Sequence, residues 1–200
     1  ECGDCGGNGP LENFDCDGNC ENSSICGEVV LSFEAATDQS VQVLYSSNFP
    51  ISGFQFDTDG VDLTGATSEL DAQFSPATGI VIGFSMSGAS LPAGEGVLAT
   101  LSFAPTNDGA TLSAGSIIIS DPDAVTLSSS GPDSINTPGC FETDCAGECY
   151  GLAELDECDV CDDDSENDCI QDCAGDWGGS AELDECGECG GDNSTCCVSG

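Results

Sequence analysis

Residues 80–86, Ile-Val-Ile-Gly-Phe-Ser-Met, and residues 97–103, Val-Leu-Ala-Thr-Leu-Ser-Phe, decide the fold of this 200-residue chain. In both stretches alternate residues are apolar and share one face of an extended chain: Ile80, Ile82, Phe84 and Met86, and then Val97, Ala99, Leu101 and Phe103. Seven more short apolar stretches lie at 29–33, 41–45, 51–56, 61–64, 70–74, 116–120 and 125–128. Turn residues separate them, and no stretch has a helical period. About nine strands at this spacing predict an all-β sandwich of immunoglobulin or jelly-roll type.

The predicted sandwich occupies residues 27–139, which contain none of the 16 cysteines. Cys26 and Cys140 stand directly at its two ends. Residues 1–26 and 140–200 are rich in cysteine, glycine and acidic residues, and have too few large apolar side chains to form a core. We therefore expect three segments: a Cys-rich segment at 1–26, the sandwich at 27–139 and a Cys-rich acidic repeat array at 140–200.

The charge of the chain limits the classes of molecule that it can bind. It has 38 Asp and Glu residues and no Lys, Arg or His, for a formal charge of −38. Such a chain should repel nucleic acid and anionic membranes. Its carboxylates can be neutralised only by protons or solvent cations, so we expect bound divalent cations, principally calcium. Without His, Lys or Arg there is no Ser-His-Asp triad, Schiff base or cationic oxyanion stabiliser, and we expect no enzymatic activity.

The cysteines predict an extracellular or cell-surface protein, because an even number at this density is typical of oxidising compartments. Zinc binding is the alternative for the Cys-x-x-Cys pairs, but zinc needs thiolates, which the surrounding carboxylates disfavour. No signal peptide or transmembrane run is present. The start at Glu1 suggests a processed product or a segment of a longer chain.

Parity limits how the cysteines can pair. Residues 1–26 hold five and residues 140–200 hold eleven, so the two segments cannot each close on themselves. One solution is a Cys26–Cys140 bridge at the base of the sandwich, since domain termini often lie close together. The other is intermolecular, with Cys197 of one unit bonded to Cys2 of the next. Mass spectrometry under non-reducing conditions separates the two.

Internal repeats connect the two Cys-rich segments. Residues 144–158 realign on 172–186 with a constant offset, and Trp177 replaces Cys149 in the second copy. Residues 1–7 match 185–191, and residues 15–20 match 144–149. The same module thus flanks the sandwich on both sides, which favours a repeat unit of a longer chain or fibre.

Two groups of oxygen ligands are candidates for a hard cation: Asp162, Asp163, Asp164 and Asp168, and then Asp15, Asp17 and Asn19. The second group alternates like the start of a calcium loop but lacks the glutamate that closes such a loop. A solvated acidic loop is the alternative for both groups. Asn22 and Asn193 begin N-glycosylation sequons.

Several stretches of the predicted sandwich, at 41–47, 51–57, 82–88 and 91–98, resemble cohesin-like domains of secreted bacterial proteins. The resemblance implies a nine-stranded sandwich used for display or for protein–protein contact. True cohesins bind dockerins through one sheet face, but no dockerin-contact motif can be mapped onto this sequence. The flanking copies resemble D-C-x-G-x-C…D-E-C-G-x-C-G-G repeats of secreted proteins from aquatic bacteria and algae, which implies an extracellular structural role.

Three non-enzymatic functions follow from these features. The first is a structural unit that self-associates into a surface fibre or matrix, stabilised by disulfides and divalent cations. The second is a cohesin-like module that presents a sheet face to a protein or carbohydrate. The third is a calcium-binding spacer within a larger adhesin. The similarity between the two ends of the chain favours the first.

Overall fold

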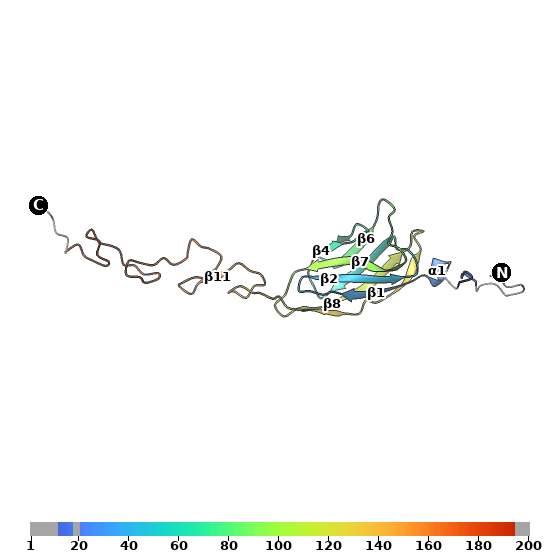
Figure 1. The fold of residues 1–200 in the computed structure, drawn as a ribbon, viewed down its shortest axis with the longest axis horizontal. Helices are drawn as coiled ribbons and strands as arrows, with labels where there is room; N and C mark the ends of the chain where they lie inside the picture. The colour runs from blue at the N-terminus through green and yellow to red at the C-terminus, as the bar shows by residue number, and fades with distance from the viewer. Residues whose placement is uncertain (1–11, 18–20, 195–200) are drawn as a thin grey trace, which may run out of the picture. The chain divides into compact units, whose positions relative to one another are not determined.

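The computed structural model describes residues 12–17 and 21–194. The chain divides into two compact units, Glu1–Cys140 and Phe141–Gly200. The first unit contains the sandwich and the second contains the repeat array (Figure 1).

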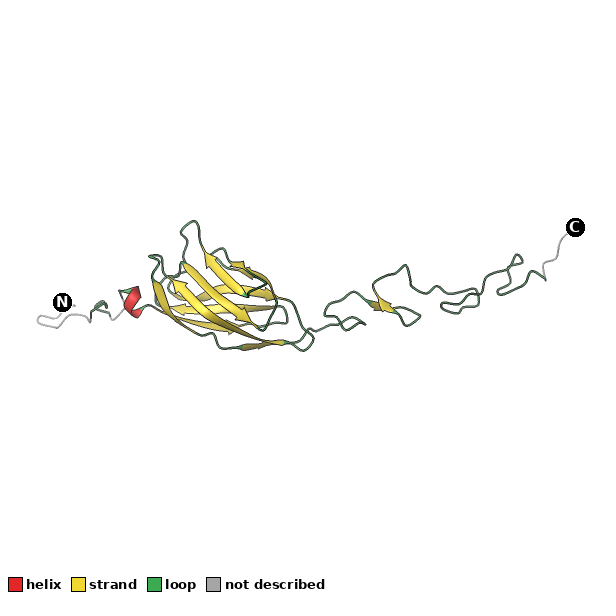
Figure 2. Ribbon diagram, turned by 180° about the vertical axis from the view of Figure 1, so that it is seen from behind, coloured by secondary structure: helices red, strands yellow, loops and turns green. Residues whose placement is uncertain are grey.

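The predicted all-β sandwich is confirmed (Figure 2). Each of the nine predicted stretches overlaps one of the strands β1 to β9, whereas the short β10 was not predicted. The strands are β1 (Glu28–Glu34), β2 (Ser40–Ser47), β3 (Gly53–Asp59), β4 (Leu63–Thr67), β5 (Gln73–Phe74), β6 (Ile80–Phe84), β7 (Gly94–Phe103), β8 (Ala110–Ser120), β9 (Thr126–Ser130) and β10 (Ile135–Thr137).

Strand pairing connects the two layers through β9. The order is β4-β7-β2-β1-β9-β8-β3-β6-β5, and β10 pairs with β8. Strand β9 runs parallel to β1 and antiparallel to β8, so it belongs to both layers, while the other neighbours are antiparallel.

Alternate side chains of both layers point inward and form one apolar core. The largest fully buried members are Phe56, Ile51, Leu70, Leu98, Leu101, Leu112, Ile119, Leu127, Val29, Val41, Val43 and Val81. Burying each large side chain contributes about 1.5–3 kcal/mol. None of these buried residues is a cysteine, so the sandwich core does not depend on covalent cross-links.

Strand β6 turns its larger side chains outward. Val81 is fully buried, and Gly83 faces inward, where a Cβ would collide with the ring of Phe54. Ile82 and Phe84 therefore lie on the outer surface, 38% and 46% exposed. The face that they share was predicted, but its outward orientation is set by the bulk of Phe54 on the neighbouring strand.

Strand β7 departs from strict alternation near its start. The pairing of β2 with β7 shifts register between Val43 and Leu44. As a result Leu98 and Ala99 are both buried, while Val97 is 42% exposed. The prediction that Val97 shares a face with Ala99 is wrong, because the irregularity moves it to the outer face.

The helix α1 (Ser23–Cys26) ties the preceding segment to the sandwich. Asn22 caps it, and the Ser23 hydroxyl donates to Asp121 Oδ2 at 2.6 Å. Burial alone would raise the pKa of Asp121, but the bonds from Ser23 and from the amides of Val125 and Asp123 outweigh it and lower the pKa. No helix in the described parts of the chain is both long and apolar enough to cross a lipid bilayer.

Cys26 and Cys140 lie at opposite ends of the sandwich. The Cys26 carbonyl accepts a bond from Asn48, just after β2, and the Cys140 amide donates to the Thr106 carbonyl, just after β7. Since β2 and β7 are antiparallel, the length of β7, about 30 Å, separates these two points. A disulfide needs Cα atoms within about 7 Å. The predicted Cys26–Cys140 bridge is therefore incompatible with this fold, and each of these disulfide-bonded cysteines has another partner.

Disulfides take the place of a core in the second unit, where Cys145–Cys161, Cys158–Cys169 and Cys173–Cys189 are bonded. The first and third bridges each join residues 16 positions apart and occupy equivalent positions in the two aligned copies. The unit also contains β11 (Glu154–Leu155) and β12 (Cys161–Asp162). Its large apolar side chains, such as Leu152 and Ile170, are mostly exposed.

Candidate functional site

The array repeats one small structure, which we call the Asp-capped hairpin. In each copy the residue before an aspartate pairs with the residue five positions after it. The aspartate Oδ1 accepts the backbone amides of the second and fourth following residues at 2.7–3.0 Å. The copies are headed by Asp144, Asp156, Asp172 and Asp184. These capping aspartates were not predicted, although an aspartate heads each aligned copy in the sequence.

In three of the hairpins the second carboxylate oxygen accepts the amide of the ninth following residue, at 3.0–3.3 Å. The seventh following residue is then a glycine: Gly151, Gly179 or Gly191. A Cβ at any of these positions would collide with the aspartate Oδ2. The spacing Asp-x₆-Gly is therefore a steric requirement of the hairpin. The donated bonds, led by the amides of Glu148, Ala181 and Glu188 respectively, lower the pKa of Asp144, Asp172 and Asp184.

The hairpin of Asp156 differs at this position, where Asp163 replaces the glycine. Its Oδ2 is buried and has no hydrogen-bond partner within the described residues. A side chain at the seventh position prevents the chain from closing over the carboxylate, which accounts for the missing bond.

The predicted cation ligands lie around this exception. A hollow of about 350 Å³ is lined by Asp156, Asp162, Asp163 and Asp168 together with Glu154 and Glu157. Burial, and then the carboxylates of Asp156 and Asp162, raise the pKa of Asp168. Asp164 does not line the hollow but accepts the amide of Glu166. Within residues 12–17 and 21–194, no three acidic, Cys or His side chains converge as a metal ligand set. The hollow concentrates carboxylates without forming a coordination shell.

The other predicted group is also a backbone cap. Asp15 Oδ1 accepts the amide of Asp17 at 2.9 Å, as in the hairpins of the array. Asn19 lies outside the described residues, as do Cys2 and Cys197 of the predicted bridge between units.

Both sequon asparagines take part in local structure. Asn22 Oδ1 accepts from Ser24, and its Nδ2 donates to Asn13 at 3.1 Å. Asn193 Oδ1 accepts the amide of Glu185 at 2.8 Å. Glycosylation at either position stays a prediction.

An apolar surface covers the outside of three adjacent strands, and we call it the β8–β3–β6 face. Gln55 at its centre pairs with Ile82 on one side and Ile118 on the other. Gly53 in the next row leaves a hollow of about 230 Å³ beside Phe84. Ile82, Phe84 and Ile118 are 38–49% exposed, which is unusual for three neighbouring large apolar residues.

Asp57 stands in the same face, between Ile80 of β6 and Gly115 of β8. Its Oδ1 is buried without a hydrogen-bond partner in the described parts of the chain. The chain has no basic residue that could pair with it. Asp57 thus adds to an otherwise apolar face a carboxylate, one of whose oxygens has no partner among the described residues.

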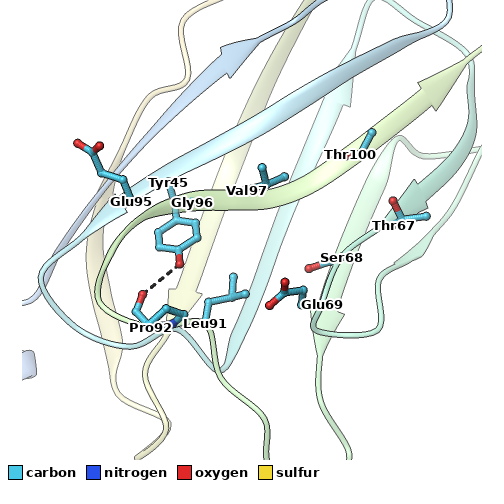
Figure 3. A pocket seen from close by; sticks show the side chains of 10 residues that line it. All are labelled: Tyr45, Thr67, Ser68, Glu69, Leu91, Pro92, Glu95, Gly96, Val97 and Thr100. Atoms are coloured by element: carbon cyan, nitrogen blue, oxygen red, sulfur yellow. Dashed lines mark hydrogen bonds between the residues drawn. The ribbon is translucent and has the colours of Figure 1, made fainter.

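A second depression lies on the other layer, along β7 and beside Gly96 (Figure 3). It has a volume of about 540 Å³. The Tyr45 hydroxyl at its edge donates to the Pro92 carbonyl at 3.0 Å. Burial, and then the charge of Glu69, raise the pKa of Tyr45.

The solved structures to which this chain is similar include cohesins. A chain of the CaDoc0917–CaCohA2 complex is 17% identical, with a TM-score of 0.44, over 56% of this chain and 99% of that one. A chain of a cohesin–dockerin complex from Clostridium thermocellum is 12% identical, with a TM-score of 0.42, over 60% of this chain and 98% of that one. The non-cellulosomal cohesin of Archaeoglobus fulgidus is 14% identical, with a TM-score of 0.41, over 56% of this chain and 90% of that one. No family model and no curated protein matches the chain. These low scores assign neither a family nor a partner.

Proposed function

We propose that this protein is a non-enzymatic, extracellular binding module, whose sandwich docks a protein partner on the β8–β3–β6 face and whose array serves as a disulfide-stapled stalk. The observation that carries the proposal is the exposed apolar surface of Ile82, Phe84 and Ile118, beside which the chain has no basic residue to neutralise the Asp57 carboxylate. A partner with an apolar patch and a Lys or Arg would cover the surface and offset that charge. This is the second of the functions that the sequence predicts.

Charge argues for a different protein as the occupant. A second copy of this chain would bring another 38 carboxylates and no basic residue to pair with Asp57. The apolar centre disfavours a simple carbohydrate, whose recognition relies on hydrogen bonding to hydroxyls. The extracellular location is supported by the disulfides of the array.

Selection of binders from a random peptide library against the oxidised full chain tests the proposal. We expect peptides that combine aromatic and basic residues, and that lose binding when Ile82, Phe84 and Ile118 are all changed to Ser. The matched control changes Ile170 and Leu183, which are exposed in the array, to Ser. Selected peptides that bind the triple variant as well as the native chain would contradict the proposal.

A fibre unit is the second candidate, favoured by the regular spacing of the hairpins and by the sequence match between the two ends of the chain. In this function the stalk continues into the next unit, through a bridge such as Cys197 to Cys2. Electrophoresis of the native material without reductant should then show a ladder that collapses when reductant is added. Monomers under both conditions would exclude a covalent fibre.

We also propose that divalent cations, principally calcium, associate with the array. The acidic hollow beside Asp156 and the raised pKa of Asp168 support an electrostatic attraction. Calcium titration should shift the amide resonances of Asp163 and Asp168 more than those of the Asp184 hairpin. Equal shifts along the whole array would indicate diffuse screening only.

A further inference from the structure

A second interaction surface lies on the opposite layer, across β7. Two depressions meet there, of about 540 Å³ and 430 Å³. They share Tyr45, Glu95, Gly96 and Val97, so they lie side by side along β7, and we treat them together as one surface. We call it the β7 groove. It runs from Val30 on β1 to Ser68 and Glu69, which follow β4.

The groove exists because of two local features of β7. The irregular pairing near Val43 turns Val97 outward, and Gly96 has no side chain, so the Tyr45 ring packs directly against it at the edge of both depressions. The groove floor is apolar, with Val97 42% and Val30 46% exposed. Leu44 lies beside Val97 across the strand pair, which extends this apolar strip over β2.

Charge defines the occupant. Glu69 and Glu95 both line the groove, and Figure 3 shows them on opposite sides of Gly96. The chain contains no Lys, Arg or His to neutralise them. A second copy would add only more carboxylates. A basic side chain, by contrast, can lay its apolar stem on Val97 and place its charge beside a carboxylate.

We propose that the β7 groove binds an extended segment of a partner protein in which Lys or Arg alternates with apolar residues. Its place on the opposite layer makes it separate from the β8–β3–β6 face. The sandwich would then hold two protein partners at once, one on each layer.

The test uses the oxidised full chain, labelled with ¹⁵N, and the synthetic peptide acetyl-Lys-Val-Lys-Val-Lys-amide, at about 150 mM salt to screen diffuse attraction. We expect saturable shifts of the Gly96, Val97 and Ser68 amides. Changing Glu69 and Glu95 to Gln should weaken binding about tenfold, the scale of losing charge-assisted pairs. The matched control changes Glu28 and Glu34 of β1 to Gln and should leave affinity unchanged.

Two outcomes would overturn the proposal. In the first, the peptide changes amide chemical shifts only in the acidic array. The other is equal weakening by the two double variants, which would reveal attraction to net charge alone. A Val97→Ser variant separates the apolar contribution and should also reduce affinity. None of these variants changes Asp57 or Ile82. A negative result therefore concerns the β7 groove alone and can be told apart from a failure of the proposed β8–β3–β6 face.

Discussion

Among single residues, Asp57 is the one whose replacement should stabilise the free protein. Its unpartnered oxygen is desolvated in the free protein. Replacing Asp57 with Val, which suits a strand beside Ile80, should raise the free energy of unfolding by about 1 kcal/mol. Urea denaturation measures this, with Asp59→Val as a control for loss of one charge at an exposed position. A loss of stability on Asp57→Val would show that the carboxylate is satisfied in solution.

The glycine of the Asp-capped hairpin can be tested in both directions. A Gly179→Ala change would place a Cβ against Asp172 and break the bond from Ala181, so the Ala181 amide should exchange faster with deuterium. Asp163→Gly should allow the Asp156 hairpin to close and slow exchange at Ser165. Unchanged exchange in both variants would refute the steric explanation.

The capping aspartates also predict acid sensitivity. Backbone bonds lower the pKa of Asp144, Asp172 and Asp184 below the ordinary value of 3.8. Since the folded-state pKa is depressed, the hairpins keep this stabilisation above pH 3.8 and lose it as pH falls through the lowered pKa. The protection factors of the Ala146, Ala174 and Cys186 amides, which are corrected for the intrinsic pH dependence of exchange, should fall only in that acidic range. A loss of protection that begins near neutral pH would implicate other groups.

Among the strands, β7 and β2 pack closely where Gly96 of β7 meets the ring of Tyr45 of β2. A Cβ at Gly96 would lie 2.9–3.1 Å from the Tyr45 ring. Gly96→Ala should therefore displace Tyr45 and lower the free energy of unfolding by about 1–3 kcal/mol. Gly65→Ala on the edge strand β4 is the control, because its Cβ would meet Ser102 only at 3.4 Å. Thermal unfolding compares the two.

Alternation in the sequence predicted nine strands because a strand with one buried face repeats its pattern every two residues. It did not predict which face of β6 is buried, since that depends on Phe54 meeting Gly83 across the sheet. The irregularity at Val43 and the positions of Cys26 and Cys140 depend on pairing between distant residues. The apolar face and the Asp57 oxygen were likewise visible only once β3, β6 and β8 were placed side by side.

In the whole molecule, the two units should respond differently to reductant. The sandwich core contains no cysteine, whereas the array depends on its bridges. Reduction should remove exchange protection from the hairpins and leave the amides of β2 and β7 protected. Hydrogen-exchange mass spectrometry with and without a phosphine reductant checks this. Simultaneous loss of protection in both units would contradict the division into independent units.

The bridges of the array also have a mechanical consequence. When the array is pulled from its ends, the disulfides Cys145–Cys161 and Cys173–Cys189 bear the tension. Most of the residues that each disulfide encloses are not stretched. The Cys145–Cys161 loop overlaps the Cys158–Cys169 loop, so the contour length between Cys145 and Cys169 is fully released only when both bonds are cleaved. Under tension the oxidised array should therefore extend less than its number of residues allows, and a reducing environment would release the withheld length in discrete steps.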